Sequence, residues 1–391
     1  MNMPKRPFGR SGEELSPLGF GCMRLPWKGA NASFIDEPRA TELIHRAIEG
    51  GVNYFDTAWP YHGVKGVMEP GQSEPFLGRA LQGGWREKIK LATKLPVWLM
   101  NEKADLDGLL NAQLERLRVE QIDFYLAHGL DVGGWERVKS LNILEFFHSA
   151  QKDGRIKHIG FSFHDEFALF EEIINAYDWE FTQIQYNYLD RDYQAGQKGL
   201  KLAYEKGLAT VIMGPLRGGA LASDLPPEAA GLLRRIRPEW SLAEWGLKWL
   251  WNQPEVNVVL SGMNEMTQLE ENIRLAAESG PGLLNQHEIQ AVEQVQKCFE
   301  ARAKVRCTGC GYCLPCPEGV DIPKNFIFYN KFHLLDSDVA RRQSFFFYQG
   351  QITGAKRADS CVGCGQCETK CPQHLPIAEL MPEVAATFAL S

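Results

Sequence analysis

Short apolar runs alternate with longer segments of helical period through about the first 280 residues. The runs that predict strands are 19–23, 53–57, 89–95, 122–128, 158–162, 182–187, 208–214 and 256–262. The segments that predict amphipathic helices between them include 40–51, 106–119 and 241–253. Apolar strands joined by crossover helices indicate parallel pairing that is buried on both faces. Eight such units predict a closed (β/α)8 TIM barrel of the α/β class.

Two breaks in this pattern mark the ends of the barrel. A GRSG turn at 9–12, between short apolar runs, predicts a hairpin ahead of the first barrel strand. At 279–288 two glycines and a proline interrupt the pattern, and a helix is expected from there to about residue 300. We therefore predict a barrel domain at 1–284, followed at 285–391 by a helical linker and a mainly α-helical domain.

Composition narrows the class of protein. The 391 residues are 44% hydrophobic and 23% charged, with a net charge of −7, which excludes a disordered chain and a small disulfide scaffold. No apolar run reaches the roughly 18 residues of a membrane span, and the N-terminus lacks the apolar core of a signal peptide. We expect a cytoplasmic protein that does not bind membranes. Nucleic-acid binding is not expected either, because there is no basic stripe with interleaved aromatic residues.

The ten cysteines are unevenly distributed. Cys22 and Cys298 stand alone in the first 300 residues, where we expect a buried apolar role for Cys22 and no ligand role for Cys298. The other eight lie in two runs, CTGCGYCLPCP (Cys307, Cys310, Cys313, Cys316) and CVGCGQCETKCP (Cys361, Cys364, Cys367, Cys371). Since thiols stay reduced in the cytoplasm, this crowding favours metal ligation over disulfides.

The second run has the C-x2-C-x2-C-x3-C-P spacing of bacterial 4Fe-4S clusters, in which the fourth cysteine ligates the other cluster. This crossover rule predicts two ligand sets, Cys307, Cys310, Cys313 with Cys371, and Cys361, Cys364, Cys367 with Cys316. The first run has only two residues before its last cysteine, which leaves the assignment of Cys316 open. A pair of zinc sites is the alternative, although zinc gains nothing from a third cysteine at the same spacing. Two clusters imply one-electron transfer, or else a purely structural role.

Four polar residues follow successive predicted strands. Asp56 and Tyr61 come after the second strand, Lys94 ends the third and His128 ends the fourth. Because active sites of these barrels lie at the carboxyl ends of the strands, the four are candidate catalytic residues. A tyrosine can protonate a nascent alkoxide if a neighbouring ammonium lowers its pKa, while Asp56 holds the lysine and His128 orients the carbonyl.

In these residues the first 280 positions resemble the aldo-keto reductase superfamily, whose barrel carries Asp, Tyr, Lys and His in this order. The resemblance implies that Tyr61 is the general acid/base, that Lys94 and Asp56 tune it and that His128 orients the substrate. The C-terminal region resembles that of a subgroup with a fused 4Fe-4S dicluster ferredoxin domain.

The resemblance also implies a nicotinamide cofactor, NADP or NAD, lying across the barrel mouth. Ser162 and Gln185 match the positions that hold its carboxamide, and Met213 stands where an aromatic residue often stacks on the ring. Gly262 and Gln268 stand where many members carry Lys and Arg for the 2′-phosphate, so the choice between NADP and NAD stays open. The cofactor-binding residues implied in this way are Ser162, Gln185, Met213, Gly214, Leu216, Arg217, Gly262, Asn264, Gln268, Glu271 and Asn272.

Further residues near the strand ends have two interpretations each. Arg217 is either a cofactor or substrate contact or a solvated loop residue. His62 and His164 could contact substrate, and Trp59 and Trp98 could line an aromatic wall, but each also fits ordinary loop packing.

Together these features predict an NAD(P)-dependent oxidoreductase that interconverts a small-molecule carbonyl and alcohol. Its clusters would exchange single electrons with a ferredoxin- or flavodoxin-like carrier. Hydride transfer moves two electrons and a cluster accepts one, so direct coupling normally requires a flavin or radical, and no flavin motif is present. The alternatives are an electron-transfer or structural iron-sulfur protein whose barrel mainly binds ligand, and a redox-neutral isomerase or epimerase that retains its nicotinamide.

Overall fold

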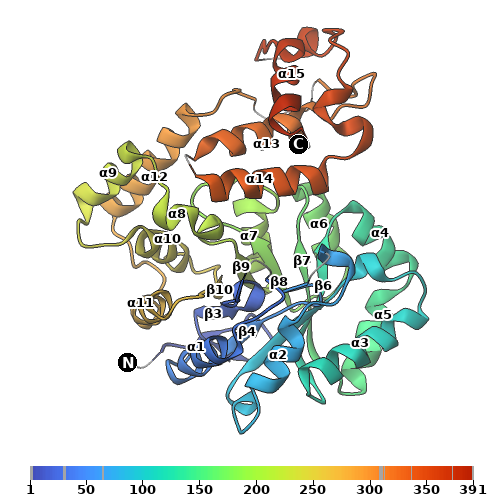
Figure 1. Ribbon diagram of the computed structural model, residues 1–391, viewed down its shortest axis with the longest axis vertical. Helices are drawn as coiled ribbons and strands as arrows, with labels where there is room; N and C mark the ends of the chain where they lie inside the picture. Colours follow the sequence, from blue (N-terminus) through green and yellow to red (C-terminus); the bar gives the residue numbers. More distant parts are fainter. Residues whose placement is uncertain are drawn as a thin grey trace. The chain divides into compact units, whose positions relative to one another are not determined.

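The chain folds into two compact units. The computed structural model describes residues 3–29, 32–63, 66–307, 311, 313–335, 337–371 and 373–389 (Figure 1). The first unit comprises Met1–Pro215 and Gly246–Asn285, and the second comprises Leu216–Trp245 and Gln286–Ser391. Each unit has its own apolar core.

The first unit is built on a closed barrel of eight parallel strands, in the spatial order β10-β3-β4-β5-β6-β7-β8-β9. Every predicted strand overlaps one of them, which confirms the (β/α)8 fold. The strands are β3 (Leu18–Gly21), β4 (Tyr54–Asp56), β5 (Lys90–Leu95), β6 (Ile122–Leu130), β7 (Ile156–Phe163), β8 (Phe181–Gln185), β9 (Ala209–Met213) and β10 (Val258–Ser261).

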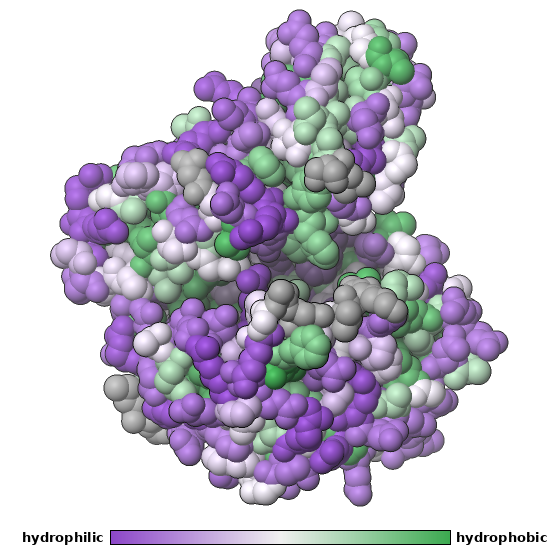
Figure 2. Space-filling model, viewed as in Figure 1, coloured by the Kyte–Doolittle hydropathy of each residue, from purple (hydrophilic) through white to green (hydrophobic). Residues whose placement is uncertain are grey.

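Helices surround these strands and present polar faces outward (Figures 1 and 2). In α1 the buried residues recur at the helical period, so that one stripe faces the sheet: Ala40, Leu43, Ile44, Ala47 and Ile48. The helices are α1 (Glu37–Glu49), α2 (Ser73–Ala80), α3 (Ala104–Leu117), α4 (Val132–Ser140), α5 (Ile143–Lys152), α6 (Phe167–Ala176), α7 (Gly196–Glu205), α10 (Leu242–Trp251) and α11 (Met266–Ala277). No helix in the described ranges is both long enough and apolar enough to span a membrane.

The second unit is helical. Its helices are α8 (Ala220–Ser223), α9 (Pro227–Ile236), α12 (Gln286–Ala301), α13 (Ile322–Leu334), α14 (Asp338–Gln351) and α15 (Ile377–Thr387). Its core combines aliphatic and aromatic side chains, and Tyr348 stacks on Phe388 with ring centroids 3.9 Å apart. Cys313 and Cys371 belong to the same core, so the packing of these helices also places the cysteine runs.

The predicted N-terminal hairpin is present as β1 (Arg6–Pro7) and β2 (Glu14–Leu15), paired antiparallel. Between them, Phe8 is fully buried and packs against three rings of the barrel interior, Tyr54, Phe124 and Phe181. Gly9 has φ +54°, and a Cβ there would lie 2.6 Å from the backbone nitrogen that begins β9. The hairpin therefore covers the end of the barrel where the strands begin.

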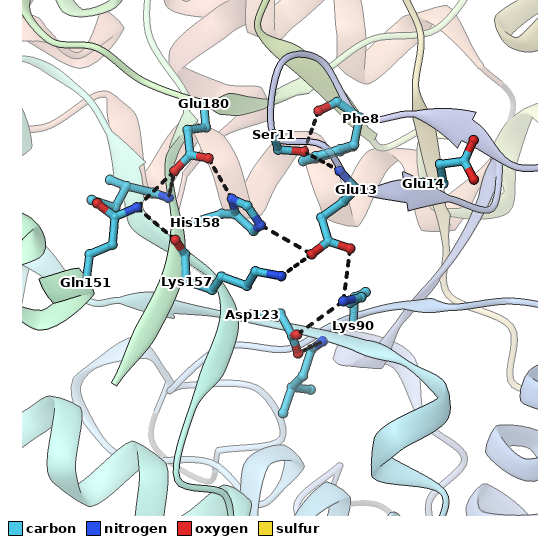
Figure 3. Close-up of polar contacts among 12 residues, drawn as sticks. Phe8, Ser11, Glu13, Glu14, Lys90, Asp123, Gln151, Lys157, His158 and Glu180 are labelled. Atoms are coloured by element: carbon cyan, nitrogen blue, oxygen red, sulfur yellow. Dashed lines mark hydrogen bonds and ion pairs between the residues drawn. The ribbon is translucent and has the colours of Figure 1, made fainter. Parts of the chain in front are cut away.

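One carboxylate of this hairpin joins it to the barrel by charge. Figure 3 shows Glu13 between Lys157 and Lys90, with both ammonium groups paired to its oxygens and Lys90 at 2.9 Å. His158 Nε2 lies 3.5 Å from the same carboxylate, and its Nδ1 lies 2.6 Å from Glu180 Oε2. Burial by itself would raise the pKa of Glu13, but the two lysines outweigh it and lower that pKa to about 2.

We predict that Glu13→Gln destabilises the protein by about 1–2 kcal/mol at pH 7, less than the full pKa shift because solvent screens the lysines. Since the folded pKa lies below its ordinary value of 4.5, the stabilisation is present above that value and is lost as the pH falls toward 2. Urea unfolding between pH 7 and pH 3, followed by tryptophan fluorescence, measures the difference. The exposed neighbour Glu14→Gln is the control, and an equal loss for Glu13→Gln at both pH values would contradict the assignment.

Candidate functional site

The four candidate catalytic residues lie at neighbouring strand ends of the first unit. Asp56 is the last residue of β4, Lys94 lies near the end of β5, His128 lies near the end of β6, and Tyr61 is in the loop after β4. Because β4, β5 and β6 are adjacent parallel strands, their carboxyl ends meet at one edge. The barrel therefore brings together residues that are up to 72 positions apart in the sequence.

The Lys94 ammonium is the centre of this group. Its Nζ donates to Asp56 Oδ1 at 2.6 Å, to the Thr57 carbonyl at 2.7 Å and to Tyr61 Oη at 3.3 Å. These three bonds use all three N–H groups of the ammonium. As the Tyr61 oxygen accepts from Lys94, its own O–H can donate elsewhere.

Burial and charge oppose each other in this group. Burial by itself lowers the pKa of Lys94, but Asp56 and Tyr61 more than offset it, so that pKa is raised and the ammonium stays charged. Burial raises the pKa of Tyr61, and Lys94 cancels only part of that rise. The ammonium does lower the phenol pKa, as expected, but the net direction is upward because desolvation is the larger effect. Tyr61 therefore keeps its proton at neutral pH.

His128 completes the group as an uncharged ring. Burial, with Lys94 and His164 adding to it, lowers its pKa well below the ordinary value. Its ring centroid lies 6.2 Å from that of Tyr61 and 5.0 Å from that of Trp98. Nδ1 is buried and has no hydrogen-bond partner among the described residues. A neutral imidazole can donate one hydrogen bond without adding a positive charge to the site.

The structure separates the other rim candidates into two groups. Trp98 and His164 lie near His128, whereas His62 and Trp59 are engaged in holding loops. His62 Nε2 accepts from the Leu25 backbone N–H at 3.2 Å, and Nδ1 lies 2.6 Å from the Ala32 carbonyl, so neither ring nitrogen is available to a substrate. Trp59 packs under the guanidinium of Arg116 at 4.9 Å. Cys22 is fully buried, as expected for an apolar role.

The implied carboxamide residues have defined hydrogen bonds. Ser162 Oγ accepts from the Gly129 backbone N–H at 2.7 Å, which leaves its own O–H to donate. Gln185 Nε2 donates to Asp190 Oδ2 at 3.0 Å, which leaves the amide oxygen of Gln185 as an acceptor. Asp190 is 5% exposed and was missed from the sequence, because its role depends on a turn that folds back toward the end of β8.

The remaining implied cofactor residues occupy separate places. Met213 ends β9 and Gly214 follows it with φ +64°. Asn264 donates its backbone N–H to Gln268 Oε1 at 3.2 Å ahead of α11, Glu271 is partly exposed on α11, and Asn272 Nδ2 donates to Ser261 Oγ at 3.1 Å. Leu216 and Arg217 belong to the second unit, where Arg217 begins the short 3-10 turn η5 (Arg217–Gly219).

Arg24 lies next to Gly262, one of the residues implied in cofactor binding. A Cβ built on Gly262 would lie 3.2 Å from Arg24 Cβ and 3.3 Å from Arg24 Cδ, so the stem of Arg24 occupies the space of a side chain at 262. Arg24 ends η1 (Cys22–Arg24), directly after β3, and β3 pairs with β10. The sequence could have indicated this contact, because closing eight strands into a barrel makes the first strand a neighbour of the last. A residue just after the first strand is then expected near residues just after the last strand.

The cysteines of the second unit line two cavities. The first is lined by Cys307, Cys313 and Cys371 together with Phe326 and Ile377. Cys310, predicted to complete this set, lies outside the described residues.

The second cavity is lined by four cysteines that form no disulfide, Cys316, Cys361, Cys364 and Cys367. Ile322, at the start of α13, lines both cavities. Four thiols around one apolar-walled cavity are a donor set that suits a 4Fe-4S cluster. Cys298 lies on α12 and lines neither cavity.

Comparison with known proteins gives two family matches. Residues 17–297 match the aldo/keto reductase family, and residues 306–376 match a 4Fe-4S dicluster domain. An uncharacterized oxidoreductase of Bacillus subtilis (strain 168), YqkF, is 26% identical over 324 residues, which cover 75% of this chain and 97% of the relative. A 6-dehydroglucose reductase of Novosphingobium aromaticivorans is 30% identical over 56% of this chain and 70% of its own length.

Solved structures agree with this assignment. The holo form of the aldo-keto reductase AKR11C1 from Bacillus halodurans superimposes with a TM-score of 0.62 at 28% identity, covering 75% of this chain and 96% of that one. The closed barrel of this chain lies within the aldo/keto reductase match at 17–297. The dicluster match at 306–376 lies within the helical second unit. The chain therefore belongs to the aldo/keto reductase family and carries a 4Fe-4S dicluster domain after its barrel.

Proposed function

We propose that this oxidoreductase interconverts a small-molecule carbonyl and its alcohol, with a nicotinamide cofactor, at the Tyr61 site. The observation that carries the proposal is the buried Lys94 ammonium, which donates to Tyr61 Oη and is anchored by Asp56 and the Thr57 carbonyl. The 6-dehydroglucose reductase among the relatives supports carbonyl reduction as the class of reaction.

The reduction needs a proton at the carbonyl oxygen and a hydride at the carbonyl carbon. Tyr61 donates the proton, and the resulting phenolate is stabilised by the Lys94 ammonium until solvent returns a proton. His128, as a neutral ring, donates a hydrogen bond that orients the carbonyl oxygen toward Tyr61. A nicotinamide cofactor, when bound, supplies the hydride. In the reverse direction the same phenolate accepts the proton of the alcohol.

We predict that Tyr61→Phe lowers kcat for carbonyl reduction by about 10²- to 10⁴-fold, because it removes the general acid without changing the shape of the site. The decrease is measured as NADPH or NADH oxidation with small aldehydes. Tyr177→Phe, a substitution near the opposite end of the barrel, is the control and is expected to keep wild-type activity. Full activity of Tyr61→Phe would contradict the proposal.

For the cofactor, we propose that Ser162 and Gln185 hold the nicotinamide carboxamide. The O–H of Ser162 and the amide oxygen of Gln185 are the complementary donor and acceptor. Met213, Gly214, Asn264, Gln268, Glu271 and Asn272 remain proposed contacts, whereas the roles implied for Leu216 and Arg217 rest on the resemblance alone. We further propose that Arg24 supplies the positive charge that Gly262 and Gln268 lack, so that the cofactor is NADP rather than NAD.

If Arg24 binds the 2′-phosphate, Arg24→Met should weaken NADPH binding about ten- to a hundredfold and leave NADH binding unchanged, because a hydrogen bond to a charged group contributes about 1.5–3 kcal/mol. Fluorescence titration with both dinucleotides measures this. Arg39→Met is the matched control, because the Arg39 guanidinium already pairs with Glu265. Equal affinities of the wild type for NADPH and NADH would contradict the role of Arg24.

We propose that the eight cysteines of the dicluster domain hold two 4Fe-4S clusters with crossed ligand sets. The cavity that combines Cys371 with Cys307 and Cys313, and the one that combines Cys316 with Cys361, Cys364 and Cys367, support this crossing. Such clusters transfer single electrons, which suits a ferredoxin- or flavodoxin-like partner. In this assignment the carbonyl chemistry belongs to residues 1–284 and electron transfer to residues 285–391.

Protein purified without oxygen should contain about eight iron atoms per chain. Cys364→Ser should lose about half of that iron together with the signal of one reduced cluster in electron paramagnetic resonance, whereas Cys298→Ser should lose none. About two zinc ions and no iron would contradict the cluster assignment.

A further inference from the structure

A buried carboxylate behind the Tyr61 site has no part in the proposed reaction. Glu74, in α2, has no exposed surface. Its oxygens accept from Thr93 Oγ1 at 2.8 Å, from Gln113 Nε2 at 2.7 Å and from Arg116 Nε at 2.9 Å. A charge buried this deeply is costly even when it is paired and hydrogen-bonded, and an apolar side chain would fill the same space at lower cost. We therefore looked for a role of Glu74 in what its hydrogen-bond partners hold in place.

On one side these contacts reach the backbone of Lys94. Gln113 Nε2, besides donating to Glu74, donates to the Lys94 carbonyl at 3.1 Å. Gln113 is itself held by Tyr125, whose hydroxyl donates to its amide oxygen at 2.6 Å. Thr93, which donates to Glu74, is the residue directly before Lys94. The end of β5 that carries the ammonium is therefore fastened to Glu74 through two side chains.

On the other side the contacts reach the loop that carries Tyr61. Arg116, paired with Glu74, donates through Nη2 to the Gly71 carbonyl. Gly71 lies directly against this loop, because a Cβ there would clash with the Tyr61 carbonyl oxygen. The Gly71 N–H donates to the Trp59 carbonyl at 2.7 Å, and Arg116 also covers the Trp59 ring at 4.9 Å.

We propose that Glu74, Gln113 and Arg116 form a brace of positioning residues that sets the separation of Tyr61 Oη and Lys94 Nζ, and so determines how readily Tyr61 gives up its proton. The proposal rests on the proposed function of Tyr61. Its physical basis is that the separation is 3.3 Å, near the outer limit of a hydrogen bond, so that a small shift of either backbone breaks the contact. The attraction between phenolate and ammonium also weakens with distance.

A brace of this kind differs measurably from a merely stabilising ion pair. Both lower stability when broken, but only the brace changes the acidity of Tyr61. In alcohol oxidation the Tyr61 phenolate is the base, so activity rises with pH through the Tyr61 pKa. Moving Lys94 away from Tyr61 raises that pKa, and the rise in activity then occurs at higher pH.

The test is the pH profile of kcat for alcohol oxidation in Glu74→Gln, which keeps the size of the side chain and removes its charge. We expect the ascending limb to move up by about one pH unit and kcat at neutral pH to fall about tenfold, with cofactor affinity unchanged. Asp123→Asn is the matched control. The Asp123 carboxylate is 8% exposed and accepts from Arg86 at 2.6 Å and from the Leu91 N–H at 2.9 Å, at the beginning of β6.

If Glu74→Gln loses stability as Asp123→Asn does and leaves the pH profile in place, the brace is only structural and the inference is wrong. Arg116→Lys, which keeps the charge but lacks the separate Nε and Nη2 groups that reach Glu74 and Gly71, should shift the limb in the same direction by less. If Glu74→Gln does not fold, Arg116→Lys is measured in its place. An ascending limb that does not shift in Arg116→Lys overturns the inference. An active Tyr61→Phe would instead refute the proposed function, so the two failures are distinguishable.

Discussion

The Lys94 ammonium is the constraint on which the site depends. It is 1% exposed, and a bare ammonium in that position would be strongly destabilising. Asp56 supplies the opposite charge, Thr57 supplies a carbonyl, and the third N–H points to Tyr61. Since all three partners come from β4 and the loop after it, the pairing of β4 with β5 is what makes the buried charge tolerable. Tyr61 is one of the groups that satisfy this ammonium.

The barrel divides its charged residues between its two ends. Where the strands begin, Glu13 and its lysines hold the hairpin onto the barrel, and Phe8 closes the interior. Where the strands end, Lys94 donates to Asp56, to the Thr57 carbonyl and to Tyr61 Oη. Because Tyr61 only accepts from Lys94, its own hydroxyl proton can be donated to another group. This division is typical of (β/α)8 proteins, in which one end supplies stability and the other supplies chemistry. The second unit has an apolar core of its own, in which cysteines line two cavities.

The sequence predicted the features that depend on local pattern. Apolar runs marked all eight strands, and Asp56, Lys94 and His128 could be found because each stands at the end of such a run. Cysteine spacing is likewise local. Residues whose role depends on contacts made only after the barrel closes were not predicted: Arg24 beside Gly262, Asp190 beside Gln185, and Glu74 between Gln113 and Arg116. The upward net shift of the Tyr61 pKa was also missed, because desolvation cannot be judged from spacing. Nor does any pattern indicate that residues 216–245 pack with the C-terminal helices, which rests on pairs such as Arg237 with Glu288.

We propose that carbonyl reduction takes a hydride from the nicotinamide and a proton from Tyr61, and that the clusters serve a separate one-electron partner. The most direct test is the fate of deuterium from a reduced nicotinamide cofactor that carries two deuterium atoms at C4, when the purified holoprotein reduces an aldehyde. We predict one deuterium on the carbinol carbon of every product alcohol, with loss of product formation in Tyr61→Phe. Alcohol formed without deuterium would mean that its electrons arrived through the clusters, and would contradict direct hydride transfer from the nicotinamide.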